Sequence, residues 1–365
     1  MKIAITVPAL QTEETLFGQQ IFAPYDLAIA LADGLTQKGH EVFFYGAPST
    51  QTEAHLVSGE TGPFTRRLQE TGLSAQDFRV KHQFEYSRLR SYFELDLLEK
   101  VYHDQLSGKV ELVHHFHNFY SLFFASLFKN KNSLVTLHDP LPASDTNNER
   151  RWLFGTHKRA KYVSISHSQR QPFSELNFVN TVYNGINTDL FSYQDKAQDY
   201  FVFAGRYVKK KGLHTAIKVC REKNLKLKIA GAVDASDEYY QQEIKPYLGD
   251  NIEDLGLLSP EKMAKLLSGA RALLFPIEWE EPFGLVMTEA MSCGTPVLAF
   301  NHGSVPEVVK DGKTGFICHD ISAMMKAVDF VEKIQRKDCR LWVEENFSLE
   351  SMVDSYLETY RQIIS

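Results

Sequence analysis

The sequence predicts an α/β protein with two domains, each built around a doubly wound parallel sheet. Its 365 residues exceed the usual size of a single domain. Short apolar runs alternate with helix-like segments along the chain, which favours parallel strands joined by helical crossovers. Twice in the second half, a strand-like run leads through a glycine-containing loop to a helix start. Such sheets bind ligands at this kind of position.

Composition excludes several classes of protein. The apolar share of 43% and the charged share of 24% are ordinary for globular domains. A net charge of -6 argues against a nucleic-acid binder. The four cysteines form no C-x-x-C pair, so we expect a reducing compartment and no zinc site. The run Met1–Pro8 predicts a short strand rather than a signal peptide, and no apolar run approaches the ~20 residues of a membrane span. We expect a cytoplasmic protein.

The first half predicts an N-terminal domain over residues 1–187. A helix over Leu27–Leu35 ends at Lys38-Gly39. The predicted strands are Lys2–Val7, Glu41–Tyr45, Val110–His114, Ser133–Leu137, Tyr162–Ser164 and Val179–Tyr183. The loop Pro8–Ile21 lies at the carboxyl end of the first strand, where ligands bind. Gly18 in this loop is a candidate ligand contact or a simple turn.

Residues Phe64–Leu106 form a more irregular segment, rich in aromatic and arginine side chains. Such a segment could meet a lipid surface or a glycan acceptor. It could equally form ordinary solvated helices. Interspersed acidic residues, among them Glu85, Glu94 and Glu99, favour the second interpretation.

Histidines follow two of the predicted strands. His115 and His117 would share a strand face, which raises the question of a metal site. Neither a cysteine nor a clear carboxylate partner follows them, so we expect no metal. His138 lies at the carboxyl end of another strand. It is a candidate ligand contact or a capping histidine.

A linker over Thr188–Asp199 leads to a second predicted domain, residues 195–347. Its first strand, Tyr200–Ala204, runs through Gly205 to a helix at Leu213–Glu222. Arginine and lysine in this turn suit a diphosphate, although a surface lysine cluster would look the same. Further predicted strands are Leu225–Ala230, Ile252–Leu255, Ala272–Phe275, Val297–Phe300 and Gly315–Ile317. Further predicted helices are Asp237–Leu248, Pro260–Leu267 and the amphipathic Ser348–Ile364.

The stretch Pro276–Pro296 combines a strand end, an acidic loop and a helix over Gly284–Cys293. Free backbone N–H groups at the helix start make an anion site, and we assign them to Phe283, Gly284 and Leu285. Glu289 shares one face with apolar residues of this helix, so its carboxylate needs hydrogen-bond donors. Sugar hydroxyls would serve. The alternative is an exposed glutamate at a chance spacing.

Glu281 and Glu289, with seven residues between them, resemble the E-x7-E motif of retaining glycosyltransferases of family 4. The resemblance continues through Gly294-Thr295-Pro296 and Gly303–Glu307. Residues 205–212 are similar to the family's Gly-Arg-x4-Lys-Gly, and residues 184–187 to its Asn-Gly-Ile-Asp. The resemblance implies the GT-B fold, in which two Rossmann-like domains face across a cleft. It also implies that the last helix, residues 348–365, packs back on the acceptor-binding first domain.

The resemblance assigns roles to single residues. Arg206 and Lys211 would bind the pyrophosphate, Glu289 the ribose, and Glu281 and His138 the donor sugar. The implied catalytic residues are His138, Arg206, Lys211 and Glu281. The implied donor-binding residues are Gly18, Asn184, Gly205, Arg206, Lys211, Glu281, Phe283, Gly284, Leu285, Val286 and Glu289. The chain departs from the family at Phe17-Gly18-Gln19-Gln20, where the family usually has two glycines.

The implied activity is transfer of a hexose from a UDP-, GDP- or ADP-linked sugar to a hydroxyl of a glycan, lipid or small molecule. No Asp-x-Asp motif occurs in the sequence, and the resemblance implies neither a metal nor another cofactor. Contact with a membrane surface is compatible with this activity. The alternatives are a nucleotide-sugar epimerase, a phosphorylase that would need a lysine carrying pyridoxal phosphate, and a non-catalytic GT-B subunit that binds a glycan or a partner.

Overall fold

The computed structural model describes residues 1–7, 10–18, 22–116, 119–125, 127, 132–143, 148–249 and 251–365. The chain forms two compact units. The first unit comprises Met1–Ile165, Pro172–Val182 and Met352–Ser365. The second unit comprises Ser166–Gln171 and Tyr183–Ser351.

Within the described residues, the first unit contains a seven-stranded parallel sheet with the order β3-β2-β1-β4-β5-β6-β7. The strands are β1 (Lys2–Thr6), β2 (Glu41–Gly46), β3 (His55–Ser58), β4 (Leu112–Phe116), β5 (Asn132–Thr136), β6 (Tyr162–Ser164) and β7 (Phe178–Thr181). Ile3 of β1 pairs with Val42 of β2 and with Leu112 of β4. The strand order therefore reverses between β1 and β4, as in a doubly wound sheet.

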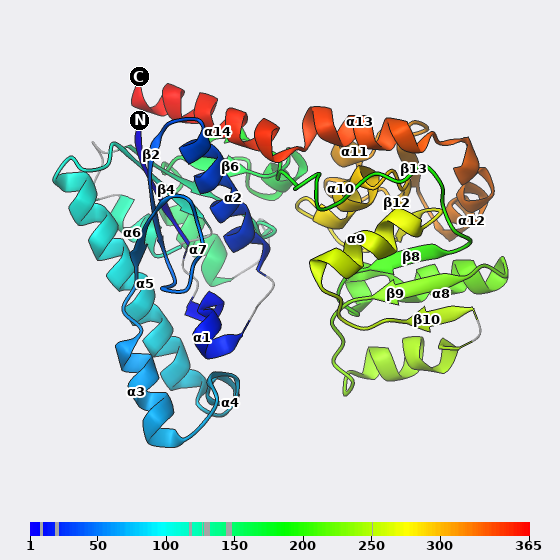
Figure 1. Ribbon diagram of the computed structural model, residues 1–365, viewed down its shortest axis with the longest axis horizontal. Coiled ribbons are helices and arrows are strands. Elements are labelled where there is room, and N and C mark those ends of the chain that lie inside the picture. Colours follow the sequence, from blue (N-terminus) through cyan, green and yellow to red (C-terminus); the bar gives the residue numbers. More distant parts are fainter. Residues whose placement is uncertain are drawn as a thin grey trace. The chain divides into compact units, whose positions relative to one another are not determined.

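Helices lie on both sides of this sheet (Figure 1). They are α1 (Glu14–Phe17), α2 (Ala23–Gln37), α3 (Gly62–Thr71), α4 (Ala75–Lys81), α5 (Gln83–Leu106), α6 (Ser121–Ala125), α7 (Glu149–Thr156) and α14 (Leu349–Ile364), whose residues from Met352 on belong to this unit. Val353 of α14 packs on Gly34 of α2, and Lys38 pairs with Asp354 at 2.7 Å.

The segment Phe64–Leu106 is less irregular than its composition indicates: α3, α4 and α5 form almost all of it, as the favoured interpretation of ordinary helices expects. Phe64, Phe78 and Phe93 are buried in one cluster, so many of the aromatic side chains point into a core. On the outer side Arg67 pairs with Glu85 at 2.7 Å. These helices therefore combine an aromatic inner face with ion-paired arginines outside.

Two histidines of β4 are core residues. His115 hydrogen-bonds Thr6 Oγ1 through Nδ1 at 2.8 Å and the Tyr102 hydroxyl through Nε2 at 3.1 Å. Burial lowers its pKa to about 3, so the ring is neutral. Both ring nitrogens are occupied, so the ring could bind a metal only by giving up one of these bonds. His117 lies outside the described residues.

His114 ties the C-terminal helix to the sheet. Its Nδ1 lies 2.6 Å from the Tyr360 hydroxyl, and its Nε2 lies 2.7 Å from Thr136 Oγ1. Tyr356 completes the network through its hydroxyl, 3.0 Å from Thr136 Oγ1. All four side chains are buried, and burial holds the pKa of His114 well below its usual range. The inner face of α14 thus carries polar as well as apolar contacts.

Within the described residues, the second unit has a six-stranded parallel sheet with the order β10-β9-β8-β11-β12-β13. The strands are β8 (Phe201–Ala204), β9 (Leu227–Ala230), β10 (Ile252–Asp254), β11 (Leu273–Phe275), β12 (Val297–Phe300) and β13 (Gly315–Cys318). Here the strand order reverses between β8 and β11. Loops that follow these two strands start at the same edge of the sheet, at its switch point.

The helices of the second unit are α8 (Leu213–Glu222), α9 (Pro260–Gly269), α10 (Leu285–Ser292), α11 (Val305–Val308), α12 (Ile321–Phe330) and α13 (Arg336–Asn346). The segment predicted as a helix, Asp237–Leu248, is helical but not a regular α-helix. A π-helical turn, Tyr240–Ile244, is followed by a 3-10 turn, Lys245–Tyr247. Pro246 has no N–H to donate and clashes with an α-helical turn before it, so a regular helix cannot run through this position.

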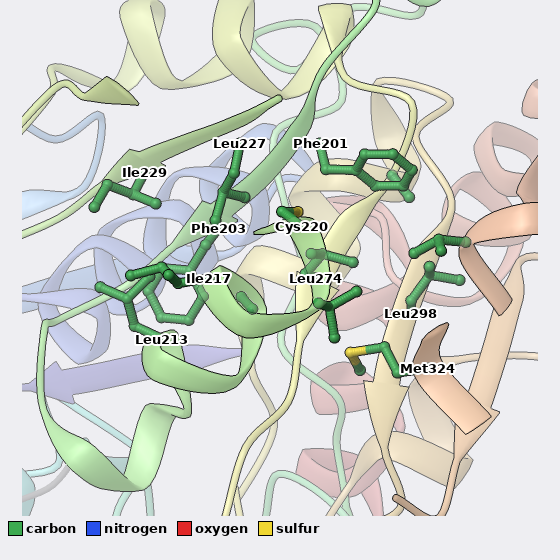
Figure 2. Close-up of a cluster of buried hydrophobic side chains, with 14 of the residues drawn as sticks. Phe201, Phe203, Leu213, Ile217, Cys220, Leu227, Ile229, Leu274, Leu298 and Met324 are labelled. Carbon is green, nitrogen blue, oxygen red and sulfur yellow. The ribbon is translucent and has the colours of Figure 1, made fainter. Parts of the chain in front are cut away.

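One apolar core joins the sheet of the second unit to α8 and α12 (Figure 2). Alternate residues of the strands point into it, such as Phe201 and Phe203 of β8. Leu213, Ile217 and Cys220 recur at helical spacing on the inner face of α8. The alternation leaves Val202 and Leu273 on the opposite face, where α10 packs on β11 and β12.

Across the described part of the chain, no helix combines the length and the apolar character that a membrane crossing needs. All four cysteines are buried and free.

Replacing Tyr360 by Phe should destabilise the first unit. The change removes the hydroxyl and leaves a buried ring nitrogen of His114 without this partner, which costs about 1–3 kcal/mol. Urea denaturation of both proteins measures the difference. Tyr92→Phe is the control, because Tyr92 is 55% exposed. Equal midpoints for Tyr360→Phe and the wild-type protein would refute the role of this bond.

Candidate functional site

Two loops at the switch point of the second sheet are packed against each other. Gly212 ends the loop after β8 with a φ of 75°, and a Cβ atom there would overlap the carbonyl oxygen of Pro276 in the loop after β11. The Glu278 N–H donates to the Lys210 carbonyl at 2.9 Å. Only glycine permits this approach of two backbones. The loops 205–212 and 276–284 therefore form one structure at the carboxyl edge of the sheet.

A third loop, which follows β12, fixes the backbone of Glu281. A Cβ atom at Gly303 would overlap the backbone of Glu281, and the Ser304 N–H donates to the Glu281 carbonyl at 3.0 Å. Ser304 Oγ also donates to the Phe283 carbonyl at 2.7 Å. The segment Gly303–Glu307, which belongs to the sequence motif, thus supports the acidic loop from behind.

Lys211 and Glu281 form an ion pair in which both side chains are mostly buried, 16% and 11% exposed. Glu281 Oε2 accepts this bond and a second one from Trp279 Nε1 at 2.9 Å. The Lys210 ammonium lies 3.8 Å from the centre of the Trp279 ring. Two charged residues selected from the sequence are therefore in direct contact. Removing either would leave the other as an uncompensated, poorly hydrated charge.

Helix α10 points its amino end at the same edge. Gly284 is its N-cap, so Phe283 and Gly284 stand just before the first turn. Their N–H groups find no acceptor among the described residues. With the dipole of the helix, they provide a place for an anion. Leu285 and Val286 follow in the first turn and are half-buried.

Glu289 lies on the less buried face of α10, with Leu285 and Val286. The opposite face, with Met287 and Met291, is fully buried. The Glu289 carboxyl makes neither a hydrogen bond nor an ion pair with the described residues, and burial raises its pKa to about 7. This carboxyl thus lacks the donors that would stabilise its ionised form.

Arg206 follows Gly205 at the end of β8 and is exposed. Its guanidinium makes no ion pair with the residues that the structure describes. The Gly205 N–H donates to the Ala230 carbonyl at 2.9 Å, which fixes the start of the loop on β9. Among the described residues, Arg206 therefore has no acidic partner, whereas Lys211 in the same loop is paired with Glu281.

Three other predicted residues lie elsewhere. Asn184 is buried in the second unit, between β7 and β8 in the chain, and among the described residues it makes no hydrogen bond to the loops 205–212 and 276–284. Gly18 and His138 belong to the first unit. Gly18 ends α1 with a φ of 65° and is exposed. His138 is half-buried and stacks on Phe116, with ring centres 5.3 Å apart. The roles assigned to these residues stay predictions.

The sequence reasoning missed the part played by Trp279 and His214. His214 Nε2 lies 3.0 Å from Glu278, and its Nδ1 lies 3.0 Å from the Tyr239 hydroxyl. Lys210 is exposed, and its ammonium lies over the Trp279 ring. A tryptophan flanked by acidic residues, just after a buried strand, was the signal that could have indicated its role.

Glu307 anchors a short segment of chain in the second unit. Its carboxylate accepts the backbone N–H groups of His167 and Ser168, both at 2.7 Å, and the Tyr183 hydroxyl at 3.0 Å. These bonds hold Ser166–Gln171, a segment that comes from between β6 and β7 in the sequence. The motif residue Glu307 is thus a structural anchor.

Two family models match consecutive parts of the chain. The model described as Glycosyltransferase Family 4 matches residues 27–190, and the model described as Glycosyl transferases group 1 matches residues 189–346. The uncharacterized glycosyltransferase MJ1178 of Methanocaldococcus jannaschii is 25% identical over 276 residues, which cover 70% of this chain and 77% of that protein. Two further relatives are matched over only 45% and 47% of their own lengths.

Solved structures show the same architecture. Sucrose-phosphate synthase from Thermosynechococcus elongatus has a TM-score of 0.75 and 19% identity, with 99% of both chains covered. Alr3699/HepE from Anabaena, solved with UDP, has a TM-score of 0.69 and 16% identity, with 99% of this chain and 100% of that chain covered. A structure of the same Anabaena protein contains UDP-glucose. These similarities confirm the fold predicted from the sequence.

The raised pKa of Glu289 predicts a stability that depends on pH. The folded protein holds this proton up to about pH 7, whereas the ordinary carboxyl loses it near 4.5. The stability from this group is therefore complete below pH 4.5 and is lost as the pH rises to about 7. Each pKa unit corresponds to about 1.4 kcal/mol, so the loss is on the order of 1–3 kcal/mol.

Melting temperatures of the ligand-free wild-type protein and Glu289→Gln, measured across this pH range, test the prediction. Because glutamine does not titrate, the wild-type protein should lose stability relative to the variant as the pH rises. Glu222→Gln, at an exposed position of α8, is the control and should follow the wild-type curve. Parallel curves for Glu289→Gln and wild type would contradict the shift.

Proposed function

Because the chain belongs to glycosyltransferase family 4 and has the GT-B fold, we propose that it transfers a sugar from a nucleoside-diphosphate sugar to an acceptor hydroxyl, with retention at the anomeric carbon. The proposal rests chiefly on one observation. The guanidinium of Arg206, which has no acidic partner within the described residues, a lysine and the amino end of α10 all come from the two loops at the switch point of the second sheet. This combination of positive groups suits a diphosphate.

In this proposal the two glutamates bind different parts of the donor. Glu289 lacks hydrogen-bond donors within the described residues, and the ribose hydroxyls of a nucleotide would supply them. Glu281 already shares Oε2 between Lys211 and Trp279, which leaves Oε1 for the hydroxyls of the donor sugar. In a bound nucleoside-diphosphate sugar, the ribose on one side of the diphosphate would contact Glu289, and the sugar on the other side would contact Glu281.

The reaction breaks the bond between the anomeric carbon and the diphosphate oxygen, and forms a bond from the same carbon to the acceptor oxygen. We propose that the leaving phosphate oxygen takes the acceptor's proton on the same face of the sugar, which retains the configuration. Charge then develops on the diphosphate. Arg206, Lys211 and the α10 amino end stabilise it, in the role that a bound metal has in other transferases. We therefore propose a reaction without a metal.

Residues of the first unit complete the proposal. His138 remains our candidate for a contact to the donor sugar, and Gly18 for the turn on the acceptor side. From the second unit, Asn184 stays a candidate donor contact. The Anabaena structures with UDP and UDP-glucose favour a uridine nucleotide as the first donor to try.

A panel of UDP, GDP and ADP, each alone and as its glucose ester, tests the proposed donor class by thermal shift. We expect one nucleotide family to raise the melting temperature, because a ligand that binds only the folded state stabilises it. AMP and inorganic phosphate are the controls. If none of the six ligands raises the melting temperature above these controls, the proposed donor class is wrong.

Lys211→Ala should weaken binding of the nucleoside diphosphate more than tenfold, because loss of a charge-assisted contact costs about 1.5–3 kcal/mol. Titration calorimetry with the nucleotide that the panel selects measures this. Lys218→Ala removes an exposed lysine from the neighbouring helix α8 and should bind like wild type. A wild-type affinity for Lys211→Ala would remove this lysine from the site.

A further inference from the structure

Trp279 contacts each charged member of the buried pair and one neighbouring cation. Its Nε1–H donates to Glu281 Oε2 at 2.9 Å. Its ring lies under the ammonium groups of Lys210 and Lys211, whose Nζ atoms are 3.8 and 4.9 Å from the ring centre. The side chain is half-buried at the edge of the loop. One residue thus touches the carboxylate and both lysines.

We propose that Trp279 is a positioning residue that holds Glu281 for the donor sugar, whether or not a diphosphate occupies Lys211. This inference rests on the proposed function. In the ligand-free protein, Lys211 and Trp279 both donate to Oε2. An arriving diphosphate competes with Glu281 for the lysine, since both are anions. Trp279 has no such competitor, because a neutral N–H is a weak partner for a phosphate beside two ammonium groups.

The hydrogen bond from the indole therefore keeps the Glu281 carboxylate in place while the Lys211 ammonium pairs with the phosphate instead. Oε1 makes no hydrogen bond with the described residues and stays directed to the sugar. The indole ring has a second role, which does not depend on the N–H. Its face attracts the ammonium groups of Lys210 and Lys211 and so restricts their positions. The two halves of Trp279 are thus separable: the N–H acts on the carboxylate and the ring acts on the cations.

Two substitutions separate these parts. Trp279→Phe keeps a ring beneath the lysines and removes the N–H. Trp279→Leu removes both. Trp342→Phe is the matched control, because Trp342 donates its own indole N–H to the Val308 carbonyl at 2.9 Å in the same unit and contacts none of these charges. It shows what loss of a structural indole bond does to binding.

The experiment measures dissociation constants of UDP, GDP and ADP and of their glucose esters by titration calorimetry. For the nucleotide that binds, Trp279→Phe should change the constant for the diphosphate by less than about twofold and weaken the glucose ester about tenfold. Trp279→Leu should weaken both. Trp342→Phe should leave the ratio of the two constants at its wild-type value.

Other results overturn the inference. If Trp279→Phe leaves the ratio unchanged, whether both constants stay the same or both rise equally, Trp279 does not act through Glu281. That result leaves the proposed function standing when the wild-type protein binds one of the six ligands. If the wild-type protein binds none, the proposed function and this inference both fail.

A second measurement covers the case in which Trp279→Phe does not fold. The double variant Trp152→Phe/Trp342→Phe leaves Trp279 as the single tryptophan of the chain. Its emission should change further with the glucose ester than with the nucleoside diphosphate, because only the ester reaches Glu281. Identical emission with both saturating ligands would overturn the inference.

Discussion

The site depends on a charge pair that is largely withdrawn from water. Lys211 and Glu281 come from loops that follow different strands, and neither side chain could be buried to this extent without the other. The pair therefore requires the two loops to meet. Gly212 permits that meeting by letting the backbone pass against Pro276, and Gly303 brings a third loop against Glu281. Two charged side chains, Lys211 and Glu281, and two glycines, Gly212 and Gly303, thus set the geometry of the three loops.

The polar groups around this pair fall into two sets, those that bind one another and those that have no partner among the described residues. Lys211, Glu281 and Trp279 satisfy one another, whereas Arg206, the carboxyl of Glu289 and the N–H groups before α10 find no partners among the described residues. The proposed donor, a nucleoside-diphosphate sugar, would supply the complementary atoms, because its diphosphate lies between the hydroxyls of the ribose and those of the sugar. In this proposal the paired groups give the site its shape, and the unpaired groups contact the donor.

Sequence patterns indicated what is local and missed what arises from tertiary packing. The strand, glycine loop and helix units around Gly205 and Gly284 were recognisable because each is a continuous stretch. The exposed strand β3 (His55–Ser58) has no apolar alternation to announce it, and α5 carries apolar residues on more than one face, so its period was obscured. Spacing selected Lys211 and Glu281 separately. Their contact, and the bond from Trp279, depend on side chains that meet only after folding.

The anchor at Glu307 has a consequence for the covalent path of the chain. The polypeptide passes from one unit to the other after Ile165, Gln171, Val182 and Ser351. A single cut therefore never yields two complete halves. A fragment beginning at Tyr183 would lack the amides of His167 and Ser168 that Glu307 binds, and its remainder would lack the last helix with Tyr356 and Tyr360. This interlaced path makes the folding of each half depend on residues encoded far from it.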